Sequence, residues 1–298
     1  MLAAFEGEGR FLKGNLHGHS TGSDGALPPD EVCARYAAAG YDFVAVSDHF
    51  MERFGHPVTD TRHARRGGFT TLLGAELHAP ATAAGDVWHI LAVGLPPDFA
   101  ATGEGESGVA LARRAAAAGA FVALAHPHWS QLTRADGLSI DAAHAVEVYN
   151  NKSAIEVDRG DGLVLWDALL HAGRRLFAIA SDDSHWHGPD AFGGWIMVRA
   201  AENAPEALLD ALKRGAFYAS QGPEIHDVAR DGDALEVRCS EAASVILAGP
   251  GPWRARQLGE SLTAVCLPLA PELGGWRRLI VRDAAGRRAW SNPLWLDG

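Results

Sequence analysis

The feature that most restricts the fold of this sequence is a regular alternation of short apolar runs with stretches of helical character. The apolar runs are as long as strands, and the stretches between them end at glycine, as helices commonly do. We expect strands at Phe11–Leu16, Tyr41–Ser47, Thr70–Ala75, Val87–Gly94, Phe121–Ala125, Ala145–Tyr149, Leu176–Ala180 and Trp195–Val198. We expect helices at Pro29–Ala39, Gly108–Ala118, Asp161–Ala172 and Pro205–Arg214. This order favours parallel strands joined by crossover helices, and seven or eight such strands are typical of a closed or nearly closed α/β barrel.

The residues after Gly222 have a different pattern. Short apolar runs are separated by turns rich in Gly and Pro, without a helical pattern between them, at Ala234–Cys239, Ala243–Leu247, Thr263–Leu267 and Leu279–Arg282. Such spacing is typical of the antiparallel strands of a sandwich. We therefore predict an α/β unit over residues 1–221 and a small all-β, sandwich-like C-terminal appendage over residues 222–298.

Polar side chains follow the predicted strands at repeating places. Five strands run directly into His, Asp or Glu at their C-terminal ends, in the segments His17-Gly18-His19, Asp48-His49, Glu76, His126 and Asp182-Asp183-Ser184-His185. In α/β barrels the C-terminal ends of the strands form one rim, where the loops build the active site. We expect these side chains, which are far apart in the sequence, to meet there.

Each of these residues has an ordinary structural explanation when it is taken alone. His17 and His19 alternate in an extended segment and so point to the same side of it, whereas Asp48 could simply cap a helix. Glu76 at the end of an apolar strand is costly to bury without a cation or a donor. Five strand ends that all supply metal-type ligands favour a metal site, and imidazole with carboxylate but no thiolate is typical of catalytic zinc, manganese or iron.

The histidines gather in the first two-thirds of the chain, and only His226 lies beyond His187. Those without a companion ligand are expected to be solvated or packed side chains, namely His56, His63, His144, His171 and His226. His78, two residues beyond Glu76, could belong to either group.

The net charge and the cysteine content limit which binding partners and which cellular compartment we expect for this protein. The formal net charge of -11 argues against broad binding to nucleic acid or to an anionic membrane, because phosphate contacts need clustered Lys and Arg. The three cysteines are far apart, which fits a reducing compartment, and the N-terminal residues lack the apolar core of a signal segment. The longest apolar stretch, Ala115–Ala125, is too short to span a bilayer. We expect a cytoplasmic protein that acts on a small, anionic molecule, with oligomerisation left open.

The motifs in this order resemble the polymerase and histidinol phosphatase (PHP) superfamily over about residues 11–220. The matching segments are His17-Gly18-His19-Ser20, Ser23-Asp24-Gly25, Ser47-Asp48-His49, Gly74-Ala75-Glu76, His126-Pro127 and Ser181-Asp182-Asp183-Ser184-His185. The Asp-Asp-Ser-His form and the β-rich tail are more similar to the carbaryl-hydrolase-like branch of these metallohydrolases. The resemblance implies a distorted (β/α)7 barrel that binds two or three divalent ions.

The resemblance also implies which residues bind each ion. The first ion would take His17, His19, Glu76 and Asp183; Glu76 would bridge to a second ion on His89 and His126; the third would take Asp24, His49 and His185. We prefer Asp183 to Asp182 because Asp-x-His is the family spacing, which leaves Asp182 to support the ligands.

The implied activity is that of a metal-dependent hydrolase, with phosphomonoester or phosphodiester hydrolysis preferred and a hydroxide between two ions as nucleophile. A neighbouring acid would protonate the leaving group, with Asp48, His128 and His187 as candidates. The segment Tyr149-Asn150-Asn151 either contacts substrate or forms a polar turn. Two alternatives stay open: hydrolysis of a carbon-centred ester, amide or carbamate by the same ions, and a non-catalytic metal-binding module.

Overall fold

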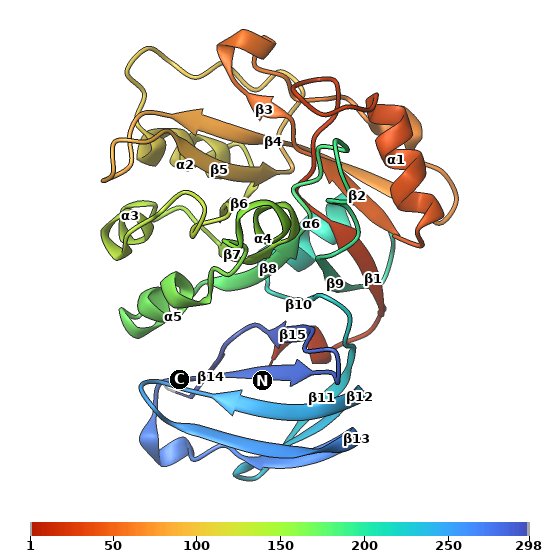
Figure 1. The fold of residues 1–298 in the computed structure, drawn as a ribbon, viewed down its shortest axis with the longest axis vertical. Helices are drawn as coiled ribbons and strands as arrows, with labels where there is room; N and C mark the ends of the chain where they lie inside the picture. The colour runs from red at the N-terminus through yellow and green to blue at the C-terminus, as the bar shows by residue number, and fades with distance from the viewer. Residues whose placement is uncertain (1, 297–298) are drawn as a thin grey trace.

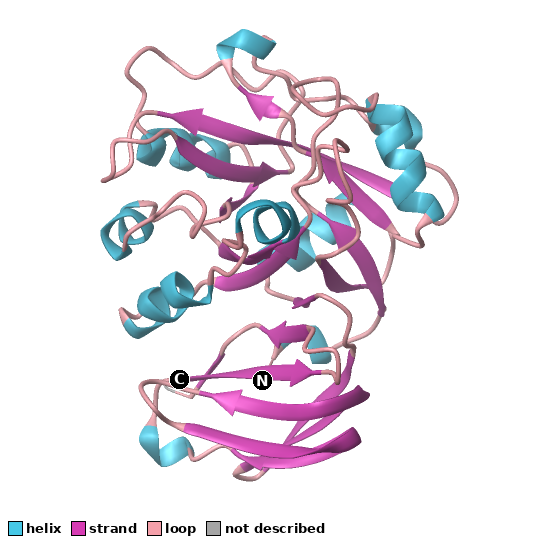
Figure 2. Ribbon diagram, in the orientation of Figure 1, coloured by secondary structure: helices cyan, strands magenta, loops and turns pink. Residues whose placement is uncertain are grey.

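The computed structural model describes residues 2–296 and shows a mixed α/β fold built on one large sheet (Figures 1 and 2). The strands up to residue 220 are β1 (Arg10–Asn15), β2 (Phe43–Val46), β3 (His49–Phe50), β4 (Thr70–Ala79), β5 (Trp88–Val93), β6 (Phe121–Leu124), β7 (Ala145–Asn150), β8 (Phe177–Ser181), β9 (Trp195–Ala200) and β10 (Phe217–Ser220). The helices are α1 (Pro29–Ala38), α2 (Gly108–Ala117), α3 (Arg134–Ser139), α4 (Asn151–Val157), α5 (Leu163–His171) and α6 (Pro205–Lys213).

These bounds confirm the eight strands and four helices expected before residue 220, to within a few residues at each end. Helix α1 begins at a proline, and α2 begins after Ser107, whose hydroxyl accepts a hydrogen bond from the Ala110 amide. Gly40 and Gly119 follow these helices with φ of 80° and 98°, which end them in the left-handed conformation. The short elements α3, α4, β3 and β10 were not expected.

The directions of β5 and β9 differ from the expected parallel order, and β9 runs antiparallel to β1. The pairs β1–β2, β2–β4, β6–β7 and β7–β8 are parallel, but β5 runs antiparallel to both β4 and β6. No helix separates β4 from β5, so the chain simply turns back between Ala79 and Trp88. This reversal places the start of β5 beside the end of β4, where His89 pairs with His78 in the ladder.

The sheet curls so that its first and last central strands meet beyond their C-terminal ends. The hydrogen-bonded path runs β9-β1-β2-β4-β5-β6-β7-β8, and a parallel bridge between Gly18 and Ser184 joins the segments after β1 and β8. At the opposite end, the Asn292 side chain accepts from the Ala178 amide of β8 and donates to the carbonyls of Gly215 and Phe217. On the side away from β7, β8 is therefore connected to the segment after β1 by an isolated backbone bridge, and to Gly215 and Phe217 through the Asn292 side chain.

Apolar side chains fill both sides of the central strands. All four residues of β2 and of β6 are buried, as near-continuous apolar runs between two covered faces should be. Gly14 of β1 makes room for the Phe43 ring, because a Cβ there would lie 2.0 Å from Phe43 Cζ. Close packing of this kind fixes the strand ends relative to one another.

The residues after Gly222 form antiparallel strands, shown in blue in Figure 1. They are β11 (Ile225–Asp231), β12 (Ala234–Ala248), β13 (Arg254–Pro268), β14 (Trp276–Arg282), β15 (Arg288–Ser291) and β16 (Leu294–Trp295). The two strands expected at Ala234–Cys239 and Ala243–Leu247 are one long, bulged strand, β12. These strands have their own apolar cluster but join the main sheet where β15 pairs with β10. Among the described residues, none of the helices combines the length and apolarity that a membrane crossing requires.

Candidate metal centre

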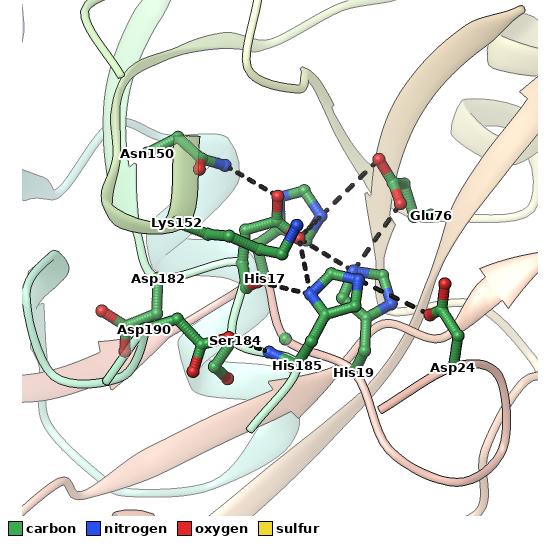
Figure 3. A network of polar contacts seen from close by, with 12 residues as sticks. His17, His19, Asp24, Glu76, Asn150, Lys152, Asp182, Ser184, His185 and Asp190 are labelled. Atoms are coloured by element: carbon green, nitrogen blue, oxygen red, sulfur yellow. Dashed lines mark hydrogen bonds and ion pairs between the residues drawn. The ribbon is translucent and has the colours of Figure 1, made fainter. Parts of the chain in front are cut away.

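Ten polar side chains converge at one rim of the central sheet. Figure 3 labels five of them: His17, His19, Asp24, Glu76 and His185. The nine residues expected as metal ligands are all among the ten, and the tenth is His78. Their ligand atoms form four overlapping groups, each within 4.8 Å: His19, Asp24, His49 and His185; His49, Glu76, His78 and His89; His17, His19 and Glu76; and His17, His126 and Asp183. We call these ten residues the histidine cluster.

Glu76 lies at the centre of the histidine cluster and is fully buried. Its Oε1 atom lies 2.8 Å from His89 Nδ1 and 2.9 Å from His126 Nε2. Its Oε2 atom lies 2.6 Å from His49 Nδ1 and 3.7 Å from His19 Nε2. A carboxylate whose two oxygens face different sets of imidazoles is placed to connect neighbouring cation sites.

The two consecutive aspartates after β8 contact different partners. Asp183 Oδ1 lies 2.9 Å from His19 Nε2 and 3.3 Å from His17 Nε2, inside the histidine cluster. Asp182 points away and accepts hydrogen bonds from the Tyr36 hydroxyl and from the backbone amides of residues 192–194. Asp183 has φ of 55°, a strained backbone of the kind found where a side chain must be aimed at a site.

The outer part of the cluster consists of Asp24, His49 and His185. Asp24 Oδ1 lies 3.4 Å from His49 Nε2 and 3.5 Å from His185 Nε2. His185 donates from Nδ1 to the Asp183 carbonyl, which turns Nε2 towards Asp24. The His19 ring lies between the other two imidazoles, with ring centroids 4.3 Å from His49 and 4.1 Å from His185.

Glu147 supports the cluster and was not expected from the sequence. This buried carboxylate of β7 pairs through Oε1 with His17 Nδ1 at 3.1 Å and accepts from the Ser181 hydroxyl. Its Oε2 accepts from the His126 amide and the Asn150 side-chain amide. A carboxylate behind a ligating imidazole fixes the ring and its tautomer. The available signal was a charged residue inside the apolar strand Ala145–Asn150.

His78, Asn150 and Asn151 also have defined contacts beside the cluster. His78 donates from Nδ1 to the Trp88 carbonyl, which leaves Nε2 facing His49 at 2.9 Å. Asn150 caps α4 and donates to the Asp183 carboxylate, and Asn151 donates to the Asp190 carbonyl. The segment after β7 therefore holds the ligand loops together, which is a structural role.

The carboxylates and histidines of the cluster shift one another's protonation. Burial alone would raise the pKa of Glu76, but the charges of His89, His49 and His17 hold that pKa well below its usual range. Burial lowers the pKa of His17, whereas the nearby carboxylates, led by Asp183, raise it by more, to well above its ordinary value. The buried negative charges thus require positive charge beside them, which protonated histidines provide here and metal cations could provide instead.

Other histidines are held neutral. Burial lowers the pKa of His19 to about 4, and the charge of His185 contributes to the shift. Burial likewise lowers the pKa of His89 to about 4. A neutral imidazole with an available nitrogen is the form that binds metal ions.

Two buried atoms at the centre of the cluster lack a well-aligned hydrogen bond. They are His17 Nε2 and Glu76 Oε2, and the latter lies near His49 without hydrogen-bond alignment. Buried polar atoms are almost always satisfied, so two unpartnered atoms within the cluster indicate a missing partner. The nitrogen and oxygen donors, the buried negative charge and these orphaned atoms fit divalent cations with mixed N/O ligation.

A cavity of about 510 Å³ opens onto the histidine cluster. Lys152 and Arg53 line it, and Lys152 pairs with Glu156 at 3.0 Å. Burial would lower the pKa of Lys152, but the carboxylates of Asp183 and Glu156 raise it above its ordinary value, so the ammonium is charged. The cluster is therefore covered by the sheet on one side and accessible from this cavity on the other.

The three residues expected as proton donors lie in different places. Asp48 is fully buried, and its carboxylate accepts hydrogen bonds from Ser20, Ser23 and Thr59, which organise the loop after β1. His128 is exposed and lines another cavity, not the one that opens onto the cluster. His187 lines the cluster cavity and donates from Nε2 to the Asp24 carbonyl at 2.8 Å.

A solved structure of another protein matches along nearly the whole chain. A two-domain protein from Bacteroides vulgatus, which contains a predicted PHP-like metal-dependent phosphoesterase, aligns over 98% of this chain and 96% of its own, with 16% identity and a TM-score of 0.56. The two proteins therefore share a fold.

Two further structures align over about three-fifths of this chain. A candidate metal-dependent phosphoesterase from Bifidobacterium adolescentis covers 61% of this chain and 91% of its own at 15% identity and a TM-score of 0.46. An amidohydrolase from Chromobacterium violaceum, with sulfate bound and no metal, covers 60% and 89% at 17% identity and a TM-score of 0.43. No protein-family model and no curated protein matches the sequence.

Proposed function

We propose that this protein is a metal-dependent hydrolase of the PHP superfamily and that it acts on phosphoesters. The convergence of the histidine cluster around the buried Glu76, below an open cavity, is the observation that carries the proposal. The motif order in the sequence and the fold shared with the Bacteroides vulgatus protein support it. The open cavity favours catalysis over a purely structural metal site, which needs no access for substrate.

The cluster has donors for two or three ions of the zinc, manganese or iron type. His17, His19 and Asp183 would hold one ion, and His89 and His126 another, with Glu76 between them. Asp24, His49 and His185 would hold a third ion at the mouth of the cavity. When bound, divalent ions supply Lewis acidity, which polarises a phosphoryl oxygen and makes water acidic enough to attack near neutral pH.

The side chains around the ions have separate tasks. Glu147 and Asn150 orient His17 and Asp183 through the hydrogen bonds described above. Lys152 and Arg53 supply positive charge to the cavity and would orient an anionic substrate. His187 is the candidate that lines this cavity, and we propose that it delivers the proton to the leaving oxygen.

Hydrolysis of a carbon-centred ester, amide or carbamate is the second candidate. The same ions would polarise a carbonyl oxygen, and exposed Trp129 and Val87 beside the cluster favour an apolar substrate.

The carbaryl-hydrolase-like branch stays a prediction. So do the cytoplasmic location and the small anionic substrate. We also propose that the central strands form the distorted barrel of the family, which the Gly18–Ser184 bridge supports, with residues 222–298 as its sandwich-like appendage.

Metal content and activity of the purified protein test the function. We expect at least two equivalents of divalent ion per chain and hydrolysis of phosphomonoesters or phosphodiesters, with weak or no cleavage of aryl carbamates. Glu76→Ala should lose bound metal and activity, while Glu236→Ala, which changes an exposed strand residue, should keep both. Metal-free wild-type protein, or an active Glu76→Ala variant, would exclude the proposal. Cleavage of carbamates alone would favour the second candidate.

A further inference from the structure

Exposed apolar side chains gather beside the histidine cluster. Large apolar residues exposed in the described part of the chain are Val87, Trp129, Ile155, Val157, Val164, Phe192, Leu258 and Leu273. Four of these line the cluster cavity or the two cavities next to it, namely Val87, Trp129, Val157 and Val164. Exposed apolar surface collected at cavities indicates a binding site for apolar groups.

Trp129 connects the cluster to this apolar surface. Its ring centroid lies 5.3 Å from that of His89 and 5.0 Å from that of His126, with both pairs edge-on. The side chain is nevertheless 41% exposed. An indole that touches two cluster histidines and still presents open surface is a platform for a ring attached to a group bound at the cluster.

Three cavities share lining residues and so lie next to one another; together we call them the groove. The cluster cavity shares Val87, His89 and Trp129 with a neighbouring cavity of about 400 Å³. That cavity shares Gln131 and Arg159 with a third, of about 640 Å³, beside the start of α5. The walls of the third cavity are mainly apolar, with Leu132, Val164 and Leu165. A ligand at the cluster can therefore extend past Trp129 into an apolar end pocket.

Two arginines line the third cavity of the groove. Arg159 lies where the second and third cavities join, and Arg134 lines the third. Arg159 is exposed and, within residues 2–296, makes no ion pair with a carboxylate. The acidic residue there, Asp161, pairs with Arg288 at 3.2 Å. In a chain of net charge -11, two arginines at an apolar pocket fit an anionic group on the ligand.

We propose that this groove binds the leaving group of the substrate, and that the leaving group is an extended aromatic one with a carboxylate at its far end. Its proximal ring would lie on Trp129 and its distal ring beside Val157 in the second cavity, with the carboxylate at Arg159, where the end pocket begins. This inference rests on the proposed hydrolase function, because it takes the histidine cluster as the place of the scissile bond.

A series of three substrates tests the groove. The substrates are phenyl phosphate, biphenyl phosphate, and biphenyl phosphate with a carboxylate at the para position of the distal ring. We expect kcat/KM to rise by about 10- to 100-fold with the second ring, because burying an aromatic ring is worth that much. The carboxylate should add about 2- to 5-fold, as an exposed ion pair does, and this gain should shrink at high salt.

Two variants should change the ratios of kcat/KM between the three substrates, mainly through KM. Trp129→Ala should remove most of the gain from the second ring, and Arg159→Gln should remove the gain from the carboxylate. Leu258→Ala in β13 and Arg113→Gln in α2 alter exposed side chains that line none of the three cavities, and both should keep the wild-type ratios. Equal kcat/KM for all three substrates, or ratios that both groove variants leave at wild-type values, would overturn the inference.

A binding measurement separates this inference from the proposed function. Calorimetry with the purified protein compares phenol with hydroxybiphenyl carboxylate, the product of the longest substrate. If no phosphoester is cleaved but the biphenyl product binds at least about tenfold more tightly than phenol, and Trp129→Ala abolishes the difference, the groove stands and the phosphoesterase proposal fails. If phosphoesters are cleaved but the two products bind alike, the groove proposal fails and the hydrolase stands.

Discussion

Glu147→Gln is the change whose consequence follows most directly from the structure. Each carboxylate oxygen of Glu147 faces two donors: Oε1 faces His17 Nδ1 and the Ser181 hydroxyl, and Oε2 faces the His126 amide and the Asn150 side-chain amide. Glutamine has the same shape but replaces one oxygen with an NH2 group. With that NH2 group at the Oε2 position, it meets two N–H donors. At the Oε1 position it can donate to the Ser181 hydroxyl, but His17 can accept from it only if the imidazole proton moves from Nδ1 to Nε2, the nitrogen that faces Glu76 and Asp183. This second orientation is the less costly one, and it puts a proton on the nitrogen that a metal ion would need.

The magnitude follows from the burial of this side chain. Glu147 is fully buried, so solvent cannot repair the lost bonds. A buried hydrogen bond that is lost or mismatched costs about 1–3 kcal/mol, and we expect a loss of this size in the free energy of unfolding from the altered contact with His17. Because the imidazole of His17 also loses its fixed orientation, metal affinity should fall by about 10- to 100-fold.

Two assays measure these effects separately. Urea denaturation of the chelator-treated protein gives the free energy of unfolding without ions, and titration with a competing chelator gives metal affinity. Glu236→Gln is the matched control, since Glu236 lies on a strand with an exposed side chain and should change neither quantity by more than about 0.5 kcal/mol. If Glu147→Gln unfolds like the control and binds metal like the wild type, the assigned hydrogen bonds are wrong.

Three further predictions concern the metal, the two aspartates and the sheet. Removing divalent ions should lower the thermal midpoint, and ions restored at about 100 times Kd should return about 2.7 kcal/mol, measured by calorimetry; an unchanged midpoint would count against the metal centre. Asp183→Asn should reduce bound metal, whereas Asp182→Asn should keep it and lower the free energy of unfolding by about 1–3 kcal/mol; metal analysis beside urea denaturation would expose a reversed pattern. Asn292→Ala should destabilise the fold by about 2–4 kcal/mol, because the Ala178 amide and two carbonyls lose their partner; a urea midpoint equal to that of the wild type would refute this.

The alternation of strands and helices was readable from the sequence because its causes are local. Proline at the start of α1, Ser107 before α2 and glycine after both helices act within a few residues. The strand ends were equally readable, since an apolar run that stops at His or Asp marks both the end of the strand and the polar rim. The convergence of side chains such as His17 and Asp183, which are distant in the sequence, followed from one further rule, that strand ends of an α/β sheet share a rim.

The direction of β5 could not be read in the same way. An apolar run has the same period whether its strand is parallel or antiparallel, and only its neighbours decide the direction. His89 stands at the beginning of its strand, yet it reaches the rim because β5 runs against β4. The family resemblance, and not the strand pattern, pointed to this residue.

The sequence by itself determined the elements, the rim and the residue types that gather there, because these depend on local propensity and on the alternation of side chains along a strand. Only the tertiary structure decided which carboxylate faces which imidazole, that Asp182 turns away while Asp183 points inward, and that Glu147 stands behind His17. These choices depend on the packing and register of strands brought together from distant parts of the chain, and the groove beyond Trp129 exists only because the loops that line it come together at the same rim.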